Sequence, residues 1–379
     1  MNSIKGELFV VNQQIIKVKN DYDKIDGILK EKNIKSIFLV CDSAFSFLKI
    51  STYLDSLEKR KGIRIVKFQD FQPNPSYESV EEGVELFNNS NCDLIMAVGG
   101  GSAIDVAKCI KLFSNMESTT NYLDSVITPN NIPIFAVPTT AGTGSESTKF
   151  AVIYYQGEKQ SITNDNCIPS VVIMDPSVLE TLPMYQKKST MLDALCHSLE
   201  SFWSINSTDE SIKYSKEALT IILENKDKYL ENDKNANERM LIAANIAGKA
   251  INITQTTAGH AMSYKLTSLY GIAHGHAVAL CDAKLIPFMI KNINLCIDKR
   301  GEDYLSQILN DIASIMHCSL SELGDTFEKI VKQLDLEVPK ATKEDYQVLV
   351  KSVNQDRLKN YPVRLSEESI DYLYHEILC

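Results

Sequence analysis

The sequence is poor in histidine and tryptophan, and it carries no excess of basic residues. Its 379 residues include six histidines and one tryptophan, and the formal net charge is −10. Nucleic acids and anionic membranes bind basic surfaces, so this charge argues against both as partners. No apolar run reaches the roughly 18 residues of a transmembrane helix, which predicts a protein without a membrane span.

The cysteines also lack a recognisable arrangement. Nine occur along the chain, and no two of them form a CxxC pair. Because they lie within apolar segments, we expect reduced and mostly buried thiols in a cytoplasmic protein. The N-terminus has no basic region followed by an apolar one, so we expect no secretory signal.

The first half of the chain alternates short apolar runs with helical patterns. Strands are expected at 35–42, 64–71, 93–101, 133–140 and from 171, helices at 76–90 and 102–116, and a hairpin or an extended arm at 150–163. Such alternation is typical of an α/β domain with a parallel sheet and helices on its faces.

Helical periodicity dominates after about residue 180. One pattern covers 234–265 without a break, and the polar stretch 224–235 is predicted to be a linker between helices. The sequence therefore predicts two domains, an α/β domain at 1–180 and an all-helical domain at 181–379.

A glycine-rich turn lies between a predicted strand and a predicted helix. In MAVGGGSAIDVAK (96–108), Gly99, Gly100 and Gly101 precede Ser102. Glycines allow the backbone to approach a ligand closely, and the N-terminus of a helix attracts a pyrophosphate. The alternative is a tight turn without a ligand. A second loop, VPTTAGTGSEST (137–148), also follows a strand, and two such loops favour a nucleotide-binding crevice.

Asp42 ends the first of the predicted strands. An acid at this position can accept hydrogen bonds from an adenosine ribose and repel a 2′-phosphate, which favours NAD over NADP. The alternative is that Asp42 caps the helix that follows.

The few histidines cluster in the helical half. Asp193 and His197 are four residues apart in MLDALCHSLE, so a helix projects them from one face. His260 and His274 lie in TTAGHAMSYKLTSLYGIAHGHAVAL (256–280). One carboxylate and three imidazoles predict a divalent metal site with an open position for a substrate. The alternatives are a helical ion pair and histidines that only pack in the core.

Several motifs together resemble the iron-containing (group III) alcohol dehydrogenases over nearly the whole chain. The motifs are PNPSYESVEEGV (73–84), DLIMAVGGGSAIDVAK, PTTAGTGSESTKFAVI, VIMDPSVLETLP, LDALCHSLES, AGHAMSYKL and GIAHGHAVA. The resemblance implies a dinucleotide-binding α/β domain followed by an all-helical domain, a fold shared with dehydroquinate synthase. It also implies a homodimer or larger homo-oligomer that interconverts alcohols and aldehydes with NAD(H), or alternatively NADP(H).

Carried over residue by residue, the resemblance assigns metal ligands and cofactor contacts. The implied ligands of Fe²⁺, or alternatively Zn²⁺, are Asp193, His197, His260 and His274. The implied cofactor-binding residues are Asp42, Asn74, Gly99, Gly100, Gly101, Ser102, Asp105, Thr139, Thr140, Thr143 and Ser145.

The sequence departs from the family pattern beside the third implied ligand. Many members have a histidine four residues after it, near the nicotinamide, where this chain has Tyr264. Tyr264 is therefore our candidate for the proton relay of catalysis. His276 is a second catalytic candidate, although a residue two positions after His274 on a helix points away from it, as in a structural role.

A narrower resemblance connects 202–211 and 247–280 to the phosphonoacetaldehyde reductase branch of the family. It implies reduction of phosphonoacetaldehyde to 2-hydroxyethylphosphonate in phosphonate metabolism. A phosphonate tail needs cationic or N–H donors, for which Lys249, Lys265, His276 and Arg300 are candidates, with a solvent-facing charge as the alternative for each.

Other functions stay open at this point. The same family implies general alcohol and polyol dehydrogenases, and the dehydroquinate synthase type uses NAD transiently in a cyclisation. Outside enzymes, the alternative is a protein that binds nucleotide and metal without turnover. Net consumption of NADH with an aldehyde distinguishes among these functions.

Overall fold

The computed structural model describes residues 13–19, 21–116, 121–353 and 355–378. Residue contacts divide the chain into two compact units. Unit 1 comprises Met1–Thr139 and Ser145–Thr181, and unit 2 comprises Thr140–Gly144 and Leu182–Cys379. The predicted domain boundary at 180 stays a prediction, because a grouping of contacts does not show that either part folds alone.

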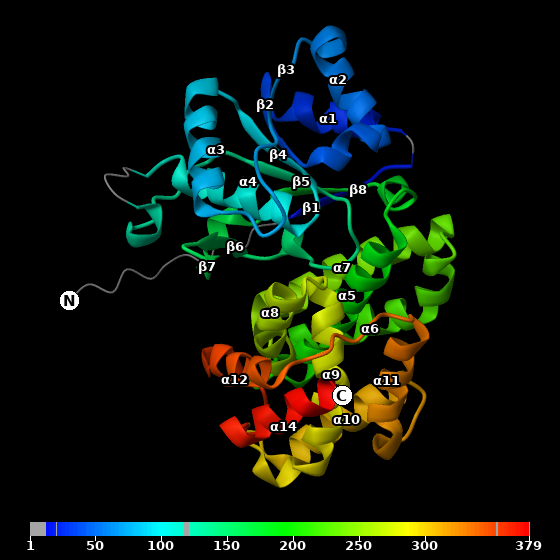
Figure 1. The fold of residues 1–379 in the computed structure, drawn as a ribbon. Coiled ribbons are helices and arrows are strands. Elements are labelled where there is room, and N and C mark those ends of the chain that lie inside the picture. The colour runs from blue at the N-terminus through cyan, green and yellow to red at the C-terminus, as the bar shows by residue number, and fades with distance from the viewer. Residues whose placement is uncertain (1–12, 20, 117–120, 354, 379) are drawn as a thin grey trace, which may run out of the picture. The chain divides into compact units, whose positions relative to one another are not determined.

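Unit 1 contains a six-stranded sheet in the order β1-β8-β5-β4-β2-β3, with every neighbouring pair parallel (Figure 1). The strands are β1 (Gln14–Lys17), β2 (Ser36–Cys41), β3 (Arg64–Phe68), β4 (Leu94–Gly99), β5 (Ile134–Pro138) and β8 (Val171–Met174). The helices are α1 (Asp23–Glu31), α2 (Lys49–Lys61), α3 (Tyr77–Ser90) and α4 (Gly101–Phe113). Every residue of β2, β4, β5 and β8 is buried, as expected for a parallel sheet covered on both faces.

Three elements of unit 1 have no counterpart in the sequence prediction. Strand β1 pairs with β8 alone, and only Ile16 of its four residues is buried, so it has no apolar run. Helices α1 and α2 carry many charged residues around a narrow buried stripe, which conceals their periodicity.

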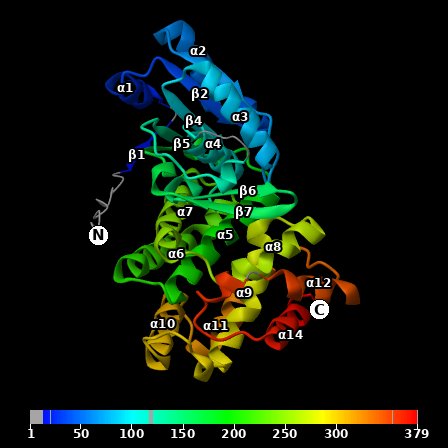
Figure 2. The same ribbon diagram turned by 90° about the vertical axis from the view of Figure 1, so that its left-hand side faces the viewer.

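The predicted hairpin is formed by β6 (Phe150–Tyr155) and β7 (Glu158–Thr163), which are antiparallel (Figure 2). Its two turn residues, Gln156 and Gly157, both have positive φ, as a type I′ turn requires. Strand β6 contacts α4, so the hairpin packs beside the helix that follows the glycine-rich turn.

Unit 2 is helical apart from its connections. Its helices are α5 (Met184–Trp203), α6 (Asp209–Leu230), α7 (Lys234–Thr254), α8 (Ala258–Tyr270), α9 (His274–Lys291), α10 (Glu302–Ile315), α11 (Leu323–Gln333), α12 (Lys343–Ser352), α13 (Gln355–Leu358) and α14 (Glu367–Ile377). Helix α5 contacts α6, α7 and α9, and α8 contacts α9, so the segments that carry the predicted ligands pack together.

Two boundaries in unit 2 correct the sequence prediction. Helix α6 continues to Leu230, so most of the polar stretch 224–235 is the end of a helix rather than a linker. The pattern over 234–265 is broken, because α7 ends at Thr254 and α8 begins at Ala258. Gln255 has a φ of 60° at this break, where neither glycine nor proline marks an end. The break creates a new helix N-terminus just before His260.

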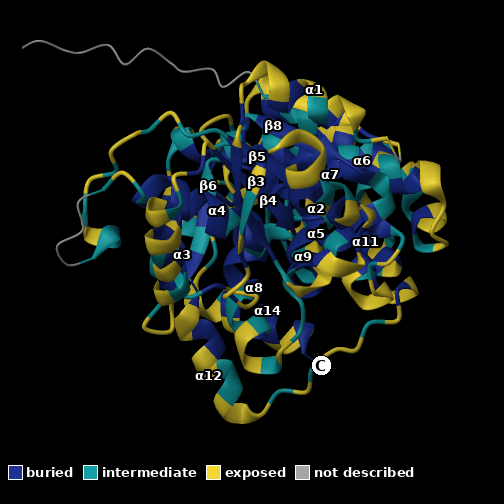
Figure 3. Cartoon of the chain, turned by 90° about the horizontal axis from the view of Figure 1, so that it is seen from above, coloured by how far each residue is buried: buried dark blue, intermediate teal, exposed yellow. Residues whose placement is uncertain are grey.

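The buried residues are concentrated in the inner elements of each unit. Strands β4 and β5 are dark blue in Figure 3, whereas α12 is mostly exposed. Six of the eight described cysteines are buried and all eight are unpaired, as expected from the sequence. Within the described ranges, no helix combines the length and apolar character that crossing a bilayer requires.

Candidate metal centre and dinucleotide turn

Three of the predicted metal ligands meet in unit 2. Asp193 lies in the middle of α5, His260 in the first turn of α8 and His274 at the first residue of α9. One ligand atom from each lies within 4.8 Å of the others. His260 and His274, which lie 67 and 81 positions after Asp193 in the chain, are brought close to it because α5 and α8 both pack against α9.

The fourth predicted ligand, His197, lies beside this group. Its Nε2 is 3.8 Å from Asp193 Oδ1, and its ring stacks on that of His260 with centroids 4.6 Å apart. The residues at i and i+4 of α5 therefore share one face, as predicted, but His197 is not among the three whose ligand atoms converge. Its ligand role stays a prediction.

The charges of this group depend on one another. Burial alone raises the pKa of Asp193, but His197 and His260 outweigh burial and lower it below its ordinary value. Burial alone lowers the pKa of His260, but the carboxylates of Glu200 and Asp193 raise it to about 10. Burial lowers the pKa of His197. A positive charge is therefore favoured between Asp193 and His260.

The residues fit a divalent metal ion. Asp193 Oδ1 and His260 Nε2 are buried and have no hydrogen-bond partner among the described residues, although they lie only 3.6 Å apart. Buried polar atoms are normally paired, so a cluster of unpaired acceptors indicates a missing cation. One carboxylate with imidazoles is a donor set that both Fe²⁺ and Zn²⁺ accept.

Two buried carboxyl groups behind the ligands have no counterpart in the predicted site. Glu200 of α5 lies 2.6 Å from His260 Nδ1, and Asp282 of α9 is fully buried. Both approach Gly259, since a Cβ there would lie 2.1 Å from Asp282 Oδ1 and 2.6 Å from Glu200 Oε1. Glu200 could have been identified from the sequence, because it follows His197 by three residues on the predicted helix. Nothing in the sequence singles out Asp282.

The two carboxyl groups differ in charge. His260 and Thr257 outweigh burial and lower the pKa of Glu200, which keeps it ionised. Burial and the negative charge of Glu200 raise the pKa of Asp282 well above its ordinary value. Neither carboxyl oxygen of Asp282 has a hydrogen-bond partner among the described residues. Burial and the neighbouring Glu200 therefore favour the neutral form of Asp282.

The two catalytic candidates lie in different surroundings. The ring of Tyr264 stacks on His274 with centroids 5.7 Å apart, so it lies next to the ligand group. His276 is buried, and its Nδ1 lies 3.3 Å from the hydroxyl of Tyr185 in the first turn of α5. His276 therefore packs toward the start of α5, its Nε2 is buried without a hydrogen-bond partner among the described residues, and its catalytic role stays a prediction.

In unit 1, the glycine-rich turn joins β4 to α4. Gly99 ends the strand, and a Cβ there would lie 2.5 Å from that of Ala103, so only glycine allows this tight connection. Gly100 is the N-cap, and α4 begins at Gly101 and Ser102. The first N–H groups of α4 have no acceptor within the helix and can bind an anion.

Asp42 lies beside this turn and also acts as a cap. Its Oδ1 accepts a hydrogen bond of 2.9 Å from the N–H of Ala44. Its Oδ2 lies 3.4 Å from the position of a Cβ on Gly99. One carboxylate oxygen of Asp42 therefore caps the following helical turn, and the other faces Gly99. The position is compatible with both interpretations of Asp42, as a cap and as a partner of the ribose.

Asp105 and Ser145 belong to a network inside unit 1. Ser145 Oγ donates to Asp105 Oδ1 at 2.5 Å, and the N–H of Val152 donates to Asp105 Oδ2. Lys108 Nζ donates to Ser145 Oγ and to the carbonyl oxygens of Thr148 and Phe150. This network joins α4 to β6, and it thereby holds in place the helix that follows the glycine-rich turn. Direct contact of Asp105 or Ser145 with a cofactor stays a prediction.

The remaining predicted cofactor residues lie in two places. Thr139 belongs to unit 1, where its N–H donates to Gly99 O at 3.0 Å. Thr140 and Thr143 belong to unit 2. Asn74 is exposed, with a φ of 59°, in the bend before α3.

The candidate cations for a phosphonate tail are not equally suitable. The guanidinium nitrogens of Arg300 donate to Asp298, to the carbonyls of Ser204 and Ser207, and to Tyr304. This arrangement holds a loop in place and occupies the guanidinium group. Arg300 is therefore poorly suited to bind a phosphonate tail. Lys249 and Lys265 are half-buried and stay candidates.

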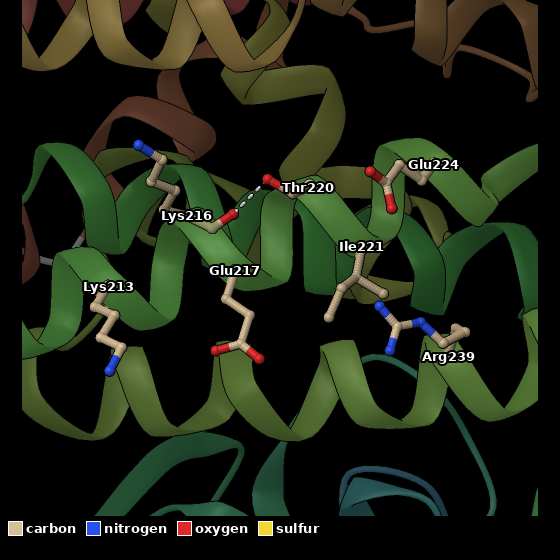
Figure 4. Close-up of a pocket in the computed structure, with 7 residues that line it drawn as sticks. All are labelled: Lys213, Lys216, Glu217, Thr220, Ile221, Glu224 and Arg239. Atoms are coloured by element: carbon tan, nitrogen blue, oxygen red, sulfur yellow. Dashed lines mark hydrogen bonds between the residues drawn. The ribbon is translucent and has the colours of Figure 1, made fainter.

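A separate surface hollow lies on α6 and α7 (Figure 4). It is lined by Lys213, Lys216, Glu217, Thr220, Ile221, Glu224 and Arg239. The lining contains two carboxylates beside three cations, so the hollow does not offer a purely basic site for an anion.

Two family models match the chain, one over most of each unit. The model described as "Iron-containing alcohol dehydrogenase" matches residues 12–176. The model described as "Fe-containing alcohol dehydrogenase family, C-terminal" matches residues 187–378. Together the two cover most of the chain.

Individual relatives carry different substrate names. The phosphonoacetaldehyde reductase of Streptomyces viridochromogenes is 30% identical over 75% of this chain and 76% of its own. The NADPH-dependent butanol dehydrogenase of Clostridium saccharobutylicum is 30% identical over 86% of this chain and 82% of its own. The solved sulfoacetaldehyde reductase from Bifidobacterium kashiwanohense, in complex with NAD+, is 25% identical with a TM-score of 0.83, covering 97% of each chain.

These matches confirm the fold class and the family that the sequence motifs predict. The parallel α/β unit with a glycine-rich turn and the helical unit with clustered ligands are the two parts that the family models match. The chain is therefore an oxidoreductase that belongs to the iron-containing alcohol dehydrogenase family.

Proposed function

We infer that the protein reduces a short aldehyde with an anionic tail, with phosphonoacetaldehyde as the best candidate and 2-hydroxyethylphosphonate as its product. The inference depends mainly on the names of two relatives, a phosphonoacetaldehyde reductase and a sulfoacetaldehyde reductase. Both names denote a two-carbon aldehyde that ends in a tetrahedral anion. The shared chemistry supports a site that accepts such a tail.

The ligand cluster supports metal-dependent chemistry. We propose that Asp193, His197, His260 and His274 hold a divalent ion, Fe²⁺ or alternatively Zn²⁺. Once bound, the ion supplies a Lewis acid for the aldehyde oxygen, and a reduced nicotinamide supplies the hydride. Burial of Asp193 and His260 keeps water from their ligand atoms. Tyr264, stacked on His274, is the proposed donor of the final proton.

A general alcohol dehydrogenase is the second candidate. It is favoured by the match to a butanol dehydrogenase, which covers more of the chain than the match to the phosphonoacetaldehyde reductase. Such an enzyme would prefer uncharged aldehydes, because an anionic tail is costly to desolvate without a cationic partner.

The substrate test compares tails of different charge. The protein is loaded anaerobically with Fe(II), and NADH absorbance is followed with phosphonoacetaldehyde, sulfoacetaldehyde and propanal. We expect kcat/KM for phosphonoacetaldehyde to exceed that for propanal by at least about 100-fold, since a site built for polar groups rejects substrates that lack them. Equal or better use of propanal would overturn the phosphonate assignment and leave the general dehydrogenase.

Cofactor choice gives a further prediction. We propose that the protein uses NAD(H) because Asp42 repels the 2′-phosphate of NADP(H). In Asp42→Asn, the amide keeps the cap on Ala44 but removes the charge. We expect kcat/KM with NADPH to rise relative to NADH by about 10- to 100-fold, as for removal of one close repulsion. Asp55→Asn, an exposed carboxyl on α2, should leave the ratio unchanged. An unchanged ratio in Asp42→Asn would contradict the assignment.

A further inference from the structure

Glu200 receives an unusual number of hydrogen bonds from one short segment. Its Oε2 accepts from the N–H of Thr257 and, at 2.7 Å, from Thr257 Oγ1. Its Oε1 accepts from the N–H of His260 at 3.1 Å and lies 2.6 Å from His260 Nδ1. The side chain is fully buried, so no water replaces these partners. All four groups belong to the start of α8, which exists because the chain breaks after Thr254.

One of these contacts determines the state of the His260 ring. An ionised carboxylate accepts hydrogen bonds but does not donate them, so Nδ1 must carry the proton that joins it to Glu200. In the neutral ring, which is the form that binds a metal, the lone pair is then on Nε2. That atom is buried without a partner among the described residues, 3.6 Å from Asp193 Oδ1. The contact with Glu200 therefore turns the free lone pair toward the other ligands.

Capping of α8 does not account for this arrangement. Two of the four contacts, from the N–H groups of Thr257 and His260, satisfy donors at a helix N-terminus and need only a carboxylate nearby. The contact with Nδ1 adds nothing to the cap. It requires Oε1 to approach the ring closely, and glycine at 259 makes room, since a Cβ there would lie 2.6 Å from Oε1.

We propose that Glu200 is a positioning residue of the metal centre, which holds the His260 ring with Nε2 toward Asp193 and His274 and strengthens it as a ligand. Carboxylate partners of this kind orient metal-bound histidines and increase their basicity, and their loss typically weakens metal binding about 10- to 100-fold. The inference rests on the proposed metal-dependent function.

The test measures metal affinity and spectrum rather than activity. The full-length protein is stripped of metal and titrated with Co(II), whose visible spectrum reports the ligand geometry. We expect Glu200→Gln and Glu200→Asp to weaken Co(II) binding by about 10- to 100-fold and to alter the spectrum. Aspartate keeps the charge but is one methylene shorter, so it carries the test if the glutamine variant does not fold.

Ser201→Ala is the matched control. Ser201 is the next residue on α5, its buried hydroxyl hydrogen-bonds to His197 O and to Ser215 Oγ, and no hydrogen bond joins its side chain to that of Glu200. We expect its Co(II) affinity and spectrum to match the wild type. Folded Glu200 variants that bind Co(II) with wild-type affinity and spectrum would overturn the positioning role. Wild-type protein that binds no Co(II) would instead overturn the proposed metal-dependent function itself.

Discussion

Replacing His260 by alanine is expected to abolish most aldehyde reduction. The substitution removes one of three converging ligand atoms and leaves Asp193 facing an unfilled space. Metal assistance contributes several kcal/mol to carbonyl chemistry, so kcat/KM should fall by about 1000-fold or more. The measurement is NADH consumption by Fe(II)-loaded protein, with bound iron determined on the same samples.

His317→Asn is the control for this experiment. His317 is exposed in a turn with a φ of 57°, a conformation that asparagine tolerates. We expect it to retain both iron and activity. If His260→Ala kept wild-type iron content and more than about a tenth of the activity, which is a loss below 1.4 kcal/mol, the proposed ligand set would be wrong.

Asp282→Asn is expected to stabilise the protein, and increasingly so as the pH rises. The pKa of Asp282 is raised in the folded state by burial and by Glu200, whereas in the unfolded chain it is about 3.9. Between these two values the folded state binds more protons than the unfolded state, so this group lowers the free energy of unfolding as the pH increases. The slope reaches about 1.4 kcal/mol per pH unit and ends above the raised folded pKa.

Asparagine removes that pH dependence without removing the side chain. Its amide does not titrate. The amide N–H can donate a hydrogen bond toward Glu200, whose carboxylate also approaches Gly259. The measurement is the urea midpoint of wild type and variant from about pH 5 to pH 9. The exposed Asp325→Asn serves as the control. A variant that loses stability relative to the wild type with rising pH would show that Asp282 is ionised in the folded protein.

The sequence carries most of the information about the type of fold. The apolar runs SIFLVC and LIMAVG are strands because their residues favour extended backbone and are buried on both faces. Strand β1 could not be found in this way, because three of its four residues are exposed and only its pairing with β8 makes it a strand. The break between α7 and α8 was hidden because both helices bury apolar residues on either side of it.

For the site, the sequence by itself predicts which residues are candidates to hold a metal. Asp193 and His197 share a face because a helix repeats every 3.6 residues, and the family motifs single out His260 and His274. Only the tertiary structure decided which buried groups support them. Glu200 meets His260 across 60 residues, and Asp282 faces Glu200 from a third helix. Contacts between distant segments depend on how helices pack, and local periodicity does not contain that information.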